Sequence, residues 1–130
     1  MKTEANGIQI NYELSGQDGA PVVMLSHSLA SSMVMWNPQL DLLASHFKVL
    51  RYDMRGHGGS EAPEGAYTLQ LLAEDAVALL DALGIDSVHF VGRLKNPYLT
   101  RKGQGTFFTQ GDDYPFHPFP DQPGRSKFRT

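Results

Sequence analysis

The hydrophobic and polar residues of this chain alternate with different periods, and each period predicts a different element. Residues 8–14 alternate between apolar and polar side chains, which is the pattern of a strand with one face toward solvent. Asn6-Gly7 comes directly before them, and this dipeptide favours the tight turn of a hairpin. We therefore expect residues 2–5 and 8–14 to form an antiparallel pair.

Three further stretches are predominantly apolar. They lie at residues 22–26, 47–52 and 88–91. Runs of this length and composition are typical of parallel strands that are buried on both faces of a sheet.

The segments between these runs have the period of amphipathic helices. Residues 36–45 carry apolar side chains at helical spacing, and residues 69–83 do so over a longer stripe. Thr68 is placed to cap the start of the second helix, and Gly84 to end it. The order of hairpin, strand, helix, strand, helix and strand predicts an α/β fold with a parallel sheet and right-handed crossovers.

The composition of the chain excludes several classes of functional site and partner. The chain has 130 residues, which suits one domain, and 41% of them are hydrophobic. It contains no cysteine, which excludes disulfides, thiolate metal sites and a cysteine nucleophile. No apolar run is long enough to span a bilayer, and the net charge of −3 gives no reason to expect nucleic acid or an anionic membrane as a partner. We expect a cytoplasmic protein.

The character of the chain changes after Gly92. Residues 1–92 hold 4 Lys/Arg and 11 Asp/Glu, a net of −7, whereas residues 93–130 hold 7 and 3, a net of +4. The second part also carries five of the eight prolines and shows no apolar periodicity. We expect an ordered core over 1–92 and an irregular, disordered tail over 93–130, although a basic, aromatic tail is also compatible with a ligand-binding segment.

Ligands of parallel α/β sheets bind at the carboxyl ends of the strands, here after Ser26, Asp53 and Gly92. The first of these loops is a turn of small residues, which can present backbone N–H groups to an oxyanion. Polar turns of this kind more often serve only local geometry, and the same interpretation is favoured for His27.

The second loop is rich in glycine. It lacks the Gly-Lys-Ser/Thr of a P-loop and the spacing of a dinucleotide-binding turn, so a phosphate cradle is not indicated. A structural role is expected for five of its residues, namely Asp53, Arg55, Gly56, His57 and Gly58. The five histidines of the chain are scattered without the spacing of metal ligands, so no metal site is expected.

Several of these segments together resemble one family. They are residues 26–32 with 35–36, then 50–58, 62–63, 67–69, 79–84 and 89–92. As a set they resemble the amino-terminal half of the α/β-hydrolases, and most closely the 3-oxoadipate enol-lactonases. The resemblance covers residues 1–92 and implies a partial α/β-hydrolase fold.

Beyond Gly92 the chain departs from the family pattern. In these hydrolases the strand runs into a Gly-x-Ser-x-Gly turn that carries the nucleophilic serine, and this chain has Leu94 at the serine position and Asn96 at the second glycine. The resemblance therefore assigns no catalytic residue, and Asp112, Asp113 and His117 do not stand in a matching context. It does imply an oxyanion donor at the Leu29 N–H, with Ser28 shaping the turn.

The family chemistry is attack of a serine on a small ester or lactone, followed by hydrolysis of the acyl-enzyme without a cofactor. We expect this chain to be a truncated or frame-disrupted hydrolase that is inactive as written. The alternative from another class is a small binding or regulatory module that uses the half-fold as a scaffold. In either case the strand at 88–91 is expected to form an exposed sheet edge through which copies can associate.

Overall fold

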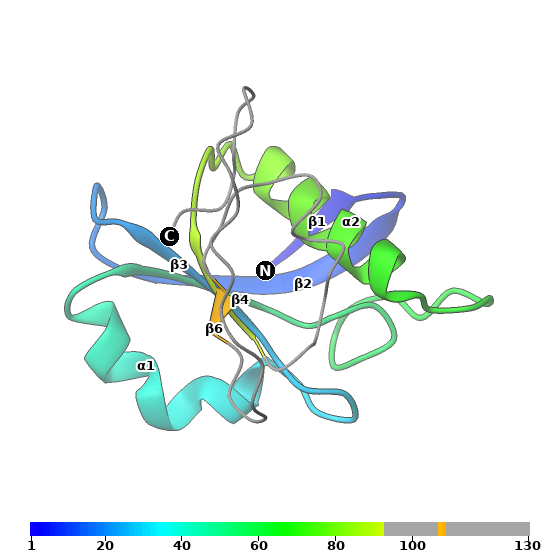
Figure 1. Ribbon diagram of the computed structural model, residues 1–130, viewed down its shortest axis with the longest axis horizontal. Helices are drawn as coiled ribbons and strands as arrows, with labels where there is room; N and C mark the ends of the chain where they lie inside the picture. The colour runs from blue at the N-terminus through cyan, green and yellow to red at the C-terminus, as the bar shows by residue number, and fades with distance from the viewer. Residues whose placement is uncertain (93–106, 109–130) are drawn as a thin grey trace.

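A twisted sheet with one helix packed on each face forms the core of the protein (Figure 1). The computed structural model describes residues 1–92 and 107–108. Its strands are β1 (Lys2–Ala5), β2 (Ile8–Gly16), β3 (Val22–Ser26), β4 (Lys48–Tyr52), β5 (His89–Gly92) and β6 (Phe107–Phe108). Its helices are the 3-10 turn η1 (Met33–Trp36), α1 (Asn37–Ala44) and α2 (Leu69–Ala82).

The strands of the described residues lie in the order β1-β2-β4-β3-β5-β6. β1 and β2 form the expected hairpin, and its turn residues Asn6 and Gly7 have φ angles of 51° and 77°. These positive angles are the ones that an Asn-Gly turn of this type requires. β2 then pairs antiparallel with β4, while β3 pairs parallel with both β4 and β5. The prediction of an α/β fold with parallel strands and crossover helices is confirmed.

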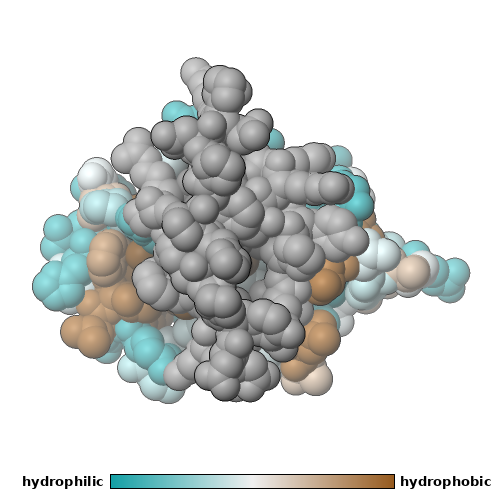
Figure 2. Space-filling model, in the orientation of Figure 1, coloured by the Kyte–Doolittle hydropathy of each residue, from teal (hydrophilic) through white to brown (hydrophobic). Residues whose placement is uncertain are grey.

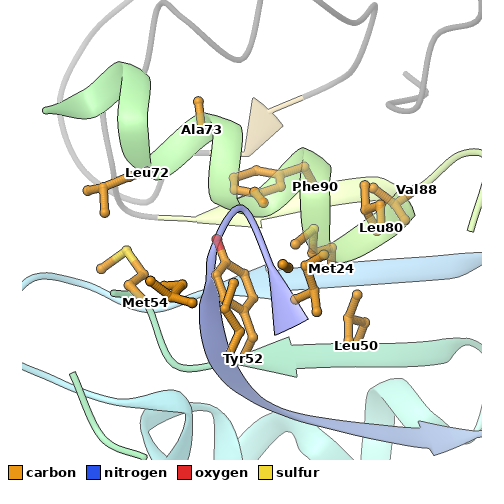
Figure 3. Close-up of a cluster of buried hydrophobic side chains, with 14 residues drawn as sticks. Met24, Leu50, Tyr52, Met54, Leu72, Ala73, Leu80, Val88 and Phe90 are labelled. Atoms are coloured by element: carbon orange, nitrogen blue, oxygen red, sulfur yellow. The ribbon is translucent and has the colours of Figure 1, made fainter. Parts of the chain in front are cut away.

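The face of the sheet under α2 holds the larger core. Leu72 and Leu80 extend from α2 toward the sheet, where Met24, Tyr52 and Phe90 complete the layer (Figure 3). α2 buries six of its residues in this layer, and Leu79 and Leu80 are completely inaccessible to solvent. The apolar stripe predicted over residues 69–83 is therefore the face of α2 that packs against the sheet.

The opposite face is covered less completely. α1 has no fully buried residue, and its Leu40 and Leu43 pack only partly against Val23, Leu25 and Val49 of the sheet. Hydrophobic residues reach the surface in the region of α1, the helix that carries the 71% exposed Leu42 (Figure 2). The two faces of the sheet thus differ in how much apolar surface they bury.

The start of α2 is held by a side-chain cap. Thr68 has an extended backbone, and its Oγ1 accepts a hydrogen bond of 3.1 Å from the Leu71 N–H. We expect Thr68→Ala to lower the free energy of unfolding by about 1 kcal/mol, because the Leu71 donor then loses its partner. Urea titration measures the change, and Thr68→Ser, which keeps the hydroxyl, serves as the control. Equal losses in the two variants would contradict a capping role.

Two expectations concern the chain after Gly92. The tail that was expected to be disordered comprises residues 93–130, which lie outside the described residues except for Phe107–Phe108. These two pair with Phe90 and Val91 as a short parallel strand, so β5 is not left as an unpaired edge. The expectation of an open edge at β5 differs from the structure because a pair of aromatic, strand-forming residues adds one more strand there.

Among the residues that the structure describes, no helix combines the length and the apolar character needed to cross a bilayer.

Candidate active site

The carboxyl ends of β3, β4 and β5 lie side by side. Ser26, the last residue of β3, is in register with Tyr52 at the end of β4 and with Gly92 at the end of β5. The loops that leave β3 and β4 therefore begin at neighbouring positions of one sheet edge, as expected for a parallel sheet.

Asp53 fixes the start of the loop after β4. Its Oδ1 accepts a hydrogen bond of 2.8 Å from the Met33 N–H, and its Oδ2 accepts bonds of 2.9 Å from Asn11 Nδ2 and from the Gly59 N–H. Burial alone would raise the pKa of this carboxyl, but the three donors hold the pKa below its ordinary value. Asp53 thus ties η1, β2 and its own loop together as a carboxylate.

Gly58 and Gly56 lie where a side chain would collide with neighbouring atoms. Gly58 has a φ of 50°, and a Cβ there would lie 2.3 Å from the carboxyl carbon of Asp53. Gly56 has a φ of 77°, and its Cβ would lie 2.5 Å from the ring of Tyr67. Both glycines allow the loop to close tightly against its neighbours.

Arg55 makes a buried ion pair with Asp75 of α2. Its Nε and one Nη donate hydrogen bonds of 2.8 Å to the two carboxylate oxygens, and Asp75 Oδ1 also accepts one of 2.8 Å from Asn6 Nδ2. Hydrogen bonding to Asp75 raises the pKa of Arg55. The pair joins the loop after β4 to α2 and to the hairpin turn.

Asp75 was not among the site residues predicted from the sequence. A signal was present, since Asp75 lies on the same helical stripe as Leu72, Ala76 and Leu79. A carboxylate on a buried stripe requires a partner.

His27 and His57 connect the two loops in both directions. His27, from the first loop, accepts a hydrogen bond of 2.8 Å from the Met54 N–H at its Nε2. His57, from the second loop, accepts one of 3.1 Å from the Ala30 N–H at its Nε2. The ring centroids lie 5.1 Å apart. Both imidazoles act as structural bridges in the described geometry.

Ser28 and Leu29 form the corner where the resemblance places the oxyanion donor. The Ser28 N–H contacts Met35 Sδ at 3.3 Å, and the Ala30 N–H is used by His57. Within residues 1–92 no hydrogen bond uses the Leu29 N–H that lies between them, and Leu29 is 62% exposed. Ala30 has a φ of 59°, which marks a sharp turn at this point. Within residues 1–92 the corner thus has one backbone donor that no hydrogen bond uses.

The described loops do not contain a paired nucleophile and base. Ser26 is buried, and its Oγ accepts a hydrogen bond of 3.2 Å from the Tyr52 hydroxyl. Burial raises the pKa of that hydroxyl to about 12, so it stays protonated at neutral pH. The two loop histidines already use Nε2 for backbone donors, and among residues 1–92 no group of three or more His, Asp or Glu is placed to hold a metal ion.

A cavity of about 530 Å³ opens at the other end of the parallel strands. It lies between the turn before β3 and the loop before β5, and Lys48 and His89 line it. Because none of the loop residues described above borders this cavity, we assign the candidate site to the carboxyl-end corner and not to the cavity.

Comparison with known proteins agrees with this geometry. The family model of the alpha/beta hydrolase fold matches residues 21–93. 3-Oxoadipate enol-lactonase 1 of Acinetobacter baylyi is 41% identical over 92 residues, which are 71% of this chain and 34% of the relative. Epoxide hydrolase A of Mycobacterium tuberculosis is 38% identical over 92 residues, or 68% of this chain and 29% of the relative.

A solved structure gives the same result. The crystal structure of the enol-lactonase from Burkholderia xenovorans LB400 superimposes with a TM-score of 0.69 at 44% identity, and the match covers 71% of this chain and 36% of that one. The chain thus spans about a third of the length of the curated relatives it matches. With its sheet order, its carboxyl-end loops and a family match over more than half of its residues, the chain belongs to the alpha/beta hydrolase fold family.

Proposed function

We propose that this chain derives from a hydrolase of small carboxylic esters or enol-lactones and that it does not catalyse hydrolysis as written. The observation that carries the proposal is the sequence Gly92-Arg93-Leu94-Lys95-Asn96, which stands where the family has its serine turn. Leucine has no oxygen that can attack a carbonyl carbon. On this proposal the chain is a truncated or frame-disrupted member of the family.

The described corner supports the substrate class. Within residues 1–92 the Leu29 N–H is used by no hydrogen bond, which supports a role as donor to the oxygen of an ester carbonyl, the group that acyl-transfer enzymes stabilise. Two relatives carry the name 3-oxoadipate enol-lactonase, so an enol-lactone is the substrate we infer for the parent enzyme.

The same corner supports inactivity. Ser26 is buried beneath Tyr52, and both histidines of the corner already bind backbone N–H groups. A serine becomes nucleophilic only when a nearby base accepts its proton. One oxyanion donor without that pair cannot form an acyl-enzyme.

The test is hydrolysis of p-nitrophenyl acetate and of 3-oxoadipate enol-lactone by the purified chain. We expect no saturable turnover above the background of free imidazole, and no labelling by a serine-directed fluorophosphonate. The Acinetobacter baylyi enol-lactonase is the positive control, and Leu94→Ser should stay unlabelled because both described loop histidines already bind backbone N–H groups. Saturable turnover that the fluorophosphonate abolishes would overturn the proposal.

A further inference from the structure

The two histidines of the corner are bound in a reciprocal arrangement. His27 belongs to the loop after β3 and accepts from Met54 in the loop after β4, while His57 belongs to the second loop and accepts from Ala30 in the first. His27 is completely buried, and its Nδ1 lies 2.8 Å from the Ser28 carbonyl oxygen. The Nδ1 of His57 lies 3.0 Å from the Arg55 carbonyl oxygen.

These partners fix the protonation of both rings. A backbone N–H can only donate, so each Nε2 must carry a lone pair, and a carbonyl oxygen can only accept, so each Nδ1 must carry the proton. Both imidazoles are therefore neutral in this geometry. A proton added to either Nε2 would place two donors face to face and break the bridge to the other loop.

Several charged and polar groups near His27 affect whether its ring carries a proton. The hydrogen bond to the Ser28 carbonyl oxygen and the nearby Asp53 carboxylate favour a charged His27. Arg55 is engaged by Asp75 of α2, and a carboxylate oxygen of Glu61 accepts from the Gln9 N–H. Burial is the largest effect, and it lowers the pKa of His27 below its ordinary value of 6.5.

We propose that the His27 and His57 bridges form a clamp that holds the corner at Ser28 and Leu29 against the glycine-rich loop, and that protonation of the buried His27 releases this clamp on acidification. The clamp is built from described contacts alone, so it stands whether or not the chain hydrolyses esters. It acts on Ala30 and Met54, and through Ala30 on the neighbouring Leu29 donor.

The sign of the pH effect follows from the lowered pKa of His27. The unfolded or released ring binds a proton at a higher pH than the clamped ring does. The stabilising contribution of the clamp is therefore complete above about pH 6.5 and is lost as the pH falls from there through the pKa of the folded state.

The first test observes the ring protons directly in the full chain. Long-range nitrogen-15 NMR spectra at pH 7.5 should show His27 and His57 as neutral tautomers with the proton on Nδ1. A proton on Nε2 of either ring would overturn the proposal. This measurement needs no variant, so it holds even if the substituted proteins fail to fold.

The second test follows amide protection. The protection factor of the Met54 N–H, corrected for the intrinsic pH dependence of exchange, should fall by about tenfold or more from pH 7.5 to pH 5.0. In His27→Gln with His57→Gln, the amide oxygens can still accept but do not titrate, so the fall should disappear. His46→Gln changes an exposed histidine away from the corner and should leave the fall unchanged. An equal fall in the double variant would refute the clamp.

Discussion

Asp75→Ala is expected to lower the free energy of unfolding by about 3–5 kcal/mol. The substitution removes the partner of Arg55, which is only 8% exposed and cannot recover its lost hydrogen bonds from water. It also removes the acceptor of the Asn6 side chain. The hydrogen bonds that join α2 to the hairpin turn and to the glycine-rich loop are then lost together. Breaking a buried pair on one side leaves an uncompensated charge, which costs far more than the loss of a surface pair.

Asp41→Ala is the matched control for this variant. Asp41 is an exposed aspartate on α1, so the same change of side chain there should alter stability by about 0.5 kcal/mol or less. Chemical denaturation followed by circular dichroism measures both. A loss at Asp75 that is no larger than the loss at Asp41 would show that the pair is not a main support of the fold.

Gly16→Ala is expected to destabilise the protein by about 2–5 kcal/mol, since it combines two separate costs. Gly16 ends β2 with a φ of 93°, a backbone conformation that residues with a side chain rarely adopt. A Cβ at this position would also lie 2.0 Å from the carbonyl oxygen of Phe47. Because that oxygen belongs to the backbone just before β4, the strand pair β2 and β4 would have to separate at this end.

Gly19→Ala is the control that separates the backbone-conformation cost from the cost of the contact with Phe47. Gly19 has a similar φ of 81°, but no atom lies within 4 Å of the place where its Cβ would stand. It should therefore show only the conformational cost, about 1–2 kcal/mol. The difference between the two urea midpoints reports the contact with Phe47, and equal midpoints would mean that the backbone there adjusts without cost.

Features that depend on nearby residues were predictable from the sequence. The turn at Asn6-Gly7, the cap at Thr68 and the apolar stripe of α2 each need only a few neighbouring residues to be recognised, and each occurs as expected. The bounds of β3 follow in the same way, because its continuous apolar run begins after Pro21 and ends at the polar loop.

The contacts that hold the site together were not predictable in this way. The sequence indicates that Asp53, Arg55 and His57 organise their loop, but their partners Asn11, Asp75 and Ala30 lie elsewhere in the chain. Such pairs form only after the sheet brings separate segments together. No local pattern distinguishes Asp75 from an ordinary helical aspartate unless its place on the buried stripe is considered.

The central place of β3 has a consequence for how the chain folds. β3 lies between β4 and β5, and its Val23 is in register with Val49 on one side and His89 on the other. Closing a long loop costs conformational entropy before any contact compensates for it, and sheets dominated by such distant pairings fold slowly. During synthesis, the hairpin can form early, but β3 has no neighbouring strand until β4 has emerged. The edge of β3 that receives β5 must wait until nearly all of the first 92 residues have left the ribosome.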